Sequence, residues 1–77
     1  MPEYKVNFTM TETDDVKRYD FYRVQAVNPE KAAIEALRTC VAKYAPPSRV
    51  WARVWGGPLP VHPNGAPLVV HSFELQI

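Results

Sequence analysis

Apolar and polar residues alternate along two stretches near the start of the chain, and a period of two predicts β-strands. The first predicted strand covers residues 3–10, and its apolar positions are Tyr4, Val6, Phe8 and Met10. A polar turn over residues 11–17 follows it. Residues 18–27 alternate again and are rich in aromatic and β-branched side chains, which favour extended backbone. We expect these two strands to form a hairpin.

A helix is predicted over residues 29–45, where the apolar spacing changes to threes and fours. Asn28 is a good N-cap because its side chain can accept from free amides, and Pro29 suits the first helical position. Glu30 favours the positive end of the helix dipole. Pro46 and Pro47 should end the helix, since proline disfavours helical geometry in the residue before it. The predicted buried stripe consists of Ala33, Ala36, Leu37, Cys40, Val41 and Tyr44.

The segment RVWARVW predicts a third strand over residues 49–55, with two unlike faces. One parity carries small uncharged side chains, which match the alanine-rich helix stripe. The other parity carries arginine and tryptophan, and burying arginines under a single helix would cost several kcal/mol each. We therefore expect the arginines and tryptophans to lie on the sheet face opposite the helix, which we call the outer face.

The fourth predicted strand covers residues 68–77. Between it and the third strand lies a proline-rich segment, residues 56–67, which we call the arm. Gly56 and Gly57 permit a kink at its start, and Pro63, Asn64 and Gly65 favour a reverse turn. The predicted fold is α+β, with the order ββαββ: a four-stranded antiparallel sheet and one helix on one face.

The outer face is the predicted functional surface. Two tryptophans and one phenylalanine can present on the order of 400–600 Å² of apolar area, and a patch of that size is often functional. Tryptophan and arginine also carry binding energy at protein interfaces more often than other residues do. We expect binding to a second copy of the chain, as a homodimer, or to another protein. The candidate partner-binding residues are Phe21, Arg23, Arg49, Trp51, Arg53, Trp55, Leu59, Val61 and His62.

Composition excludes several other classes of protein. The chain has 77 residues, enough for one domain with a modest core, and its net charge of +1 provides no global attraction for nucleic acid or membrane. Cys40 is the single cysteine, so no internal disulfide can form and a reducing cytoplasm is expected. We find no signal peptide pattern and no apolar run long enough to span a membrane. His62, His71 and Cys40 lack the paired spacing of a metal site, so no metal or cofactor is expected.

Three alternatives stay open. Arginine stems can pack over tryptophan rings on an exposed sheet without any partner. Interleaved aromatic and basic residues can also hold single-stranded nucleic acid, although Glu3 and Glu74 should lower the potential of the same face. Finally, removal of Met1 would expose the secondary amine of Pro2 as a general base or nucleophile, as in the small tautomerases. The similarity ends at Pro2, because those chains pass from the first strand into a helix.

The chain is expected to act without catalysis, because it carries no catalytic signature. A single compact domain of this length is typical of accessory proteins encoded by phages or bacterial operons, and association alone suggests that origin.

Overall fold

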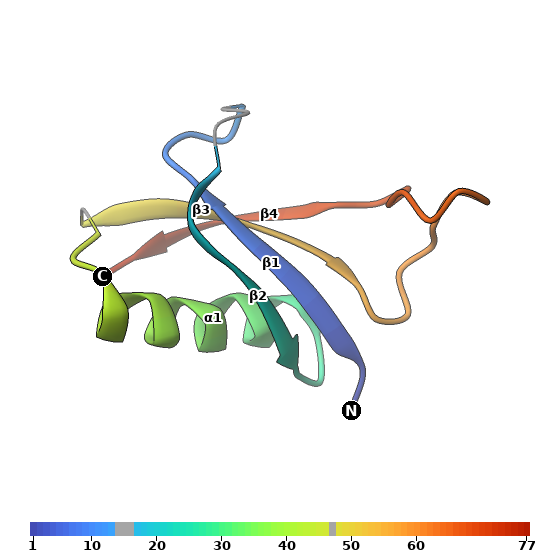
Figure 1. The fold of residues 1–77 in the computed structure, drawn as a ribbon, viewed down its shortest axis with the longest axis horizontal. Helices are drawn as coiled ribbons and strands as arrows, with labels where there is room; N and C mark the ends of the chain where they lie inside the picture. Colours follow the sequence, from blue (N-terminus) through green and yellow to red (C-terminus); the bar gives the residue numbers. More distant parts are fainter. Residues whose placement is uncertain (14–16, 47) are drawn as a thin grey trace.

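A computed structural model describes residues 1–13, 17–46 and 48–77, and it has the predicted ββαββ order (Figure 1). Residues 14–16 of the predicted turn and Pro47 lie outside the described residues. The strands pair antiparallel in the order β2-β1-β3-β4. The elements are β1 (Glu3–Thr9), β2 (Arg18–Gln25), α1 (Pro29–Lys43), β3 (Arg49–Gly56) and β4 (His71–Gln76).

The core lies between α1 and one face of the sheet (Figure 1). Three alanines on α1, Ala32, Ala33 and Ala36, are fully buried and let the helix approach the sheet closely, where β3 presents small side chains. Larger side chains come from β1, and full burial of each is worth about 1.5–3 kcal/mol. The central buried residues are Tyr4, Val6, Phe8, Ala32, Ala33, Ala36, Cys40, Val50, Ala52 and Val54.

The helix begins as its sequence predicts. The Asn28 side chain accepts from the Lys31 amide at 2.8 Å, and Pro29 occupies the first helical position. The helix ends at Lys43, two residues before the predicted end. Tyr44 is extended, with φ −119° and ψ 167°, while its amide still donates to the Cys40 carbonyl. This turn directs the Tyr44 hydroxyl toward Asp20 of β2, at 3.0 Å.

Strand β2 contains an irregularity that the alternation does not predict. Its register with β1 shifts between Val6 and Phe8, and Tyr19 has a φ of 64° at this point. A bulge of this kind bends the strand and redirects side chains. Tyr19 consequently packs against the core and lies 5.2 Å from the ring of Tyr44, between centroids.

Strand β1 departs from simple alternation at its far end. Met10, the last apolar position of the predicted strand, lies beyond β1 and is 36% exposed. Asn7 and Thr9 occupy the polar positions of the alternation, yet both are buried. The Thr9 hydroxyl donates to the Thr11 carbonyl at 2.8 Å, which gives this buried polar group a partner.

The arm extends beyond the sheet, away from the helix (Figure 1, orange). Gly56 and Gly57 have φ values of 88° and 57°, which confirms the kink at its start. A small hairpin follows, in which the Gly65 amide donates to the His62 carbonyl at 2.9 Å and Val61 bridges to Pro67. Because this hairpin ends near residue 68, β4 begins at His71, three residues later than predicted.

Candidate partner-binding surface

The register of β3 places its arginines and tryptophans on the outer face. Val50, Ala52 and Val54 are almost completely buried on the helix side. Side chains alternate along a strand, so the other parity must point away from the helix. The outer residues of β3 are Arg49, Trp51, Arg53 and Trp55.

Phe21 and Arg23 of β2 join this surface across β1. The rings of Phe21 and Trp55 lie 5.8 Å apart between centroids, and the Arg23 guanidinium lies 5.8 Å from the Phe21 centroid. Lys5 of β1 pairs with Arg23 on one side and with Trp55 on the other. The structure thus brings two aromatic rings and two cations together from three neighbouring strands.

The outer face is less open than the strand pattern alone predicts. Trp51, Arg53 and Trp55 are all half-buried. One reason is the segment after β1, because Arg53 Nη2 donates to the Glu12 carbonyl at 2.9 Å and holds that segment over the sheet. The exposed apolar area is therefore smaller than that of free rings.

A hollow of about 330 Å³ lies on the outer face. Its walls come from β1, β3, the chain before β2 and the chain before β4. Two of its lining residues, Lys17 and Arg53, are cations, and the others are apolar or uncharged. The complete lining is Asn7, Lys17, Arg53, Trp55, Pro67 and Val70.

The three predicted arm residues differ in how far they are exposed. Leu59 is half-buried and packs against the core, which gives it a structural role. Val61 is 51% exposed, and His62 is exposed at the tip hairpin. The sequence does not predict the contributions of Lys17, Pro67 and Val70 to the hollow, because no local signal marks these positions. Asn7 was identifiable by its parity alone.

The ion pair between Arg49 and Glu74 on the outer face is weak. Arg49 Nη1 lies 3.9 Å from Glu74 Oε1, and both side chains are well exposed. Exposed pairs of this kind contribute about 0–1 kcal/mol. Arg49 therefore keeps most of its donor capacity for solvent or a partner.

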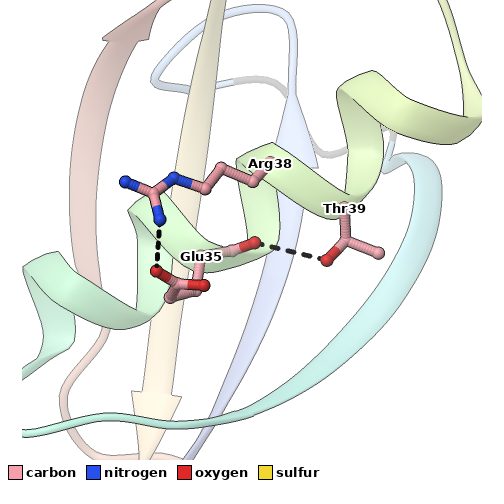
Figure 2. Close-up of polar contacts among 3 residues, drawn as sticks. All are labelled: Glu35, Arg38 and Thr39. Atoms are coloured by element: carbon pink, nitrogen blue, oxygen red, sulfur yellow. Dashed lines mark hydrogen bonds and ion pairs between the residues drawn. The ribbon is translucent and has the colours of Figure 1, made fainter.

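The exposed side of α1 offers a contrasting surface. Arg38 and Glu35 form an ion pair at 2.9 Å, and the Thr39 hydroxyl donates to the Glu35 carbonyl at 3.3 Å (Figure 2). Lys43 likewise pairs with Asp20 at 2.8 Å. Charges on this side are balanced within the chain, so the outer face is the better candidate for recognition.

The fold and this surface define the chain as a small two-layer α+β domain with a basic, aromatic sheet face. Comparisons with family models, with curated proteins and with solved structures each find no match for the chain. The described part of the chain has no helix both long and apolar enough to cross a membrane. Nor do its described residues bring three histidine, cysteine or acidic side chains together as a metal site.

Proposed function

We propose that this protein is a non-catalytic binding module whose outer face and arm take an acidic, partly apolar segment of another protein. The observation that carries the proposal is the hollow beside Trp55. It combines an aromatic wall with two cations, and none of its lining residues is acidic.

The cations of the hollow favour an acidic partner. Arg53 uses one nitrogen for the Glu12 carbonyl, but a guanidinium has five N–H donors in a planar fork, so others stay available for a carboxylate. Lys17 also lines the hollow and is exposed. Lys5 and Arg23 extend the positive potential along the sheet, which steers an acidic segment toward the hollow.

Apolar contacts supply the second part of the recognition. Trp55, Pro67 and Val70 line the hollow, and Val70 is 45% exposed. An aromatic or aliphatic side chain of the partner would be buried against these residues. The Trp55 ring would lose little conformational entropy in this contact. A second copy placed face to face would set cation against cation, so a foreign partner fits the outer face better than a homodimer does.

The expected setting is a reducing cytoplasm and an accessory role in a phage or bacterial operon. The buried free thiol of Cys40 is consistent with that setting, and the small size of the domain supports the accessory role. These points rest on general association and belong to the proposal.

The test uses short peptides and the intrinsic fluorescence of tryptophan. A peptide of glutamate, aspartate and leucine should shift the emission of the protein, whereas the same peptide with lysine in place of the acids should not. Arg53→Gln should weaken binding of the acidic peptide at least about tenfold, since a charged pair in a half-buried site is worth roughly 1.5–3 kcal/mol. Arg38→Gln, on the exposed side of α1, is the matched control and should bind normally.

A mixed-sequence single-stranded oligonucleotide distinguishes the remaining alternative. Stacking on Trp55 would quench its emission and weaken steeply with added salt. Quenching by the oligonucleotide together with no response to the acidic peptide would contradict the proposed protein partner.

A further inference from the structure

Two strands form the edges of the sheet, and only one of them is regular. The β2 edge is interrupted by the register shift and by Tyr19 in left-handed geometry. Bulges of this kind protect an edge against pairing with another chain. Strand β4 pairs with β3 in unbroken register from His71 to Gln76. No such interruption protects its other side within the described residues.

The hydrogen bonds between β3 and β4 fix which backbone groups face outward. The Ile77 amide donates to the Ser48 carbonyl at 2.9 Å, so Ile77 directs its backbone groups toward β3. These groups alternate in direction along an antiparallel strand. The backbone N–H and C=O groups of Ser72, Glu74 and Gln76 therefore point away from the sheet, toward solvent.

The side chains of β4 on the helix side are apolar except at His71, where the strand begins. Phe73 and Leu75 are half-buried and pack at the margin of the core. Ile77 is 52% exposed and Val69 is 36% exposed. Both have the same parity along the chain as Phe73 and Leu75. The margin of the core thus continues as an uncovered apolar row along the β4 edge.

We infer that two copies of the chain pair through this edge, β4 against β4 in antiparallel orientation, with the two-fold axis at Phe73. The sheet then continues through both copies, and the two helices lie on the same side. This inference goes beyond the proposed function, because it uses the edge and leaves both outer faces open.

The register follows from two requirements. Apolar faces coincide only when paired residues have the same parity, which puts the axis on a residue and not between residues. An axis at Glu74 would set the two carboxylates directly opposite each other, and like charges in that position are unfavourable. An axis at Phe73 instead pairs Glu74 with Ser72 of the second copy.

The same register provides contacts for the exposed apolar ends. Val69 of one copy faces Ile77 of the other, and Phe73 faces its own equivalent. A second hollow, of about 490 Å³, lies beside Ile77 and is lined by Met10, Ser48, Arg49, Gln76 and Ile77.

The first experiment measures the mass of the full chain by light scattering over a range of concentrations. The wild type should change from monomer to dimer as concentration rises. Ser72→Pro removes an N–H group that points to solvent and breaks no hydrogen bond within the sheet. It should abolish the dimer, while the monomer stays folded and still shows a cooperative thermal unfolding transition. Ser72→Ala is the control and should dimerise like the wild type. A wild type that stays monomeric, or a Ser72→Pro dimer of unchanged affinity, overturns the inference.

Cysteine cross-linking tests the register even if Ser72→Pro fails to fold. Phe73→Cys should form a disulfide-linked dimer under mild oxidation, because equivalent residues at the axis lie as a pair without mutual hydrogen bonds, at Cα distances of about 4.5–5.5 Å. Leu75→Cys should form no disulfide-linked dimer in the same assay, since residue 75 faces His71 of the second copy. Cross-linking of Leu75→Cys alone, or of neither variant, would overturn the Phe73 axis.

Discussion

The ring of Tyr4 closes over the backbone of Gly57, so that a Cβ atom at Gly57 would lie 2.9 Å from the Tyr4 Cε1 atom. Gly57 also has a φ of 57°, which L-amino acids with a side chain adopt only at a cost. The kink that begins the arm is thus tied to the packing of a buried core residue, since Tyr4 is 2% exposed.

Gly57→Ala should destabilise the fold by about 2–4 kcal/mol. About 1 kcal/mol comes from the left-handed backbone, and the rest from displacing the Tyr4 ring. Gly65→Ala is the matched control, because Gly65 has a φ of 87° but nothing within 4 Å of its Cβ position. It should lose only about 1 kcal/mol. Equal losses in urea unfolding of the two variants would show that the Tyr4 contact is unimportant.

Two tyrosines on the helix side predict different changes in the free energy of unfolding when the hydroxyl is removed. The Tyr22 hydroxyl is buried without a hydrogen-bond partner of ordinary geometry among the described residues. Burial is the main cause that raises the pKa of Tyr22 well above its usual value, and the neighbouring Cys40 thiol is the second. The Tyr44 hydroxyl, by contrast, bonds Asp20 at 3.0 Å.

Tyr22→Phe should therefore leave the free energy of unfolding unchanged or raise it by up to about 1 kcal/mol, because it removes an unsatisfied polar group. Tyr44→Phe should lower it by about 0.5–1.5 kcal/mol. Chemical denaturation of both variants at neutral pH measures the difference. A larger loss for Tyr22→Phe than for Tyr44→Phe would contradict the assignment of Tyr22 as unsatisfied.

The contact between β2 and the end of α1 predicts a dependence of stability on pH. Hydrogen bonds from Lys43 first and Tyr44 second lower the pKa of Asp20 below its usual value in the folded state. The resulting stability is complete above the unfolded pKa and is lost as the pH falls through the folded pKa. The same contact raises the pKa of Lys43, so its contribution is lost as the pH rises through that raised value.

Asp20→Asn should destabilise the protein at neutral pH, and its difference from the wild type should shrink as the pH falls below about 4. Urea unfolding followed by circular dichroism at a series of pH values provides the measurement. Glu35→Gln, which also removes one exposed carboxylate, controls for the change in net charge. A difference between Asp20→Asn and wild type that is constant from neutral to acid pH would exclude the Asp20 contact as its source.

Elements whose signals are local could be predicted from the sequence. The alternation of Val50, Ala52 and Val54 with larger residues depends only on strand geometry, and the structure confirms the placement of both faces. The helix start at Asn28 and Pro29 likewise depends on neighbouring residues alone. The ββαββ order follows from these local signals and the turns between them.

The shape of the outer face depends on contacts between distant segments, which no local pattern specifies. Asn7 is buried beside Arg53, its partner on β3, and Arg53 in turn donates to the carbonyl of Glu12, a residue distant from it in the sequence. The φ of Tyr19 accompanies a shift of two residues in the pairing register of β1 with β2, and the alternation of side chains cannot reveal this shift. Lys17 and the residues before β4 meet only because these loops close over the same strands.

The arm separates a structural part from a recognition part, and this division can be tested by a deletion. Leu59 packs against the core, whereas Val61 and His62 are exposed. The Leu68 amide donates to the Pro60 carbonyl at 3.1 Å, so the two ends of the tip hairpin already lie together. Residues 61–67 can therefore be replaced by an Asn-Gly turn that joins Pro60 to Leu68.

This replacement should lower the free energy of unfolding by less than about 1 kcal/mol, because a shorter loop has a smaller closure entropy and few core contacts are lost. Leu59→Ala should cost about 1–2 kcal/mol, as expected for a half-buried leucine. The deletion also removes Pro67 from the wall of the hollow, so binding of the acidic peptide should weaken although the fold persists. Urea unfolding and peptide titration of the same samples separate the two effects. If the deletion variant unfolds, the tip hairpin stabilises the sheet, and its assignment to recognition is wrong.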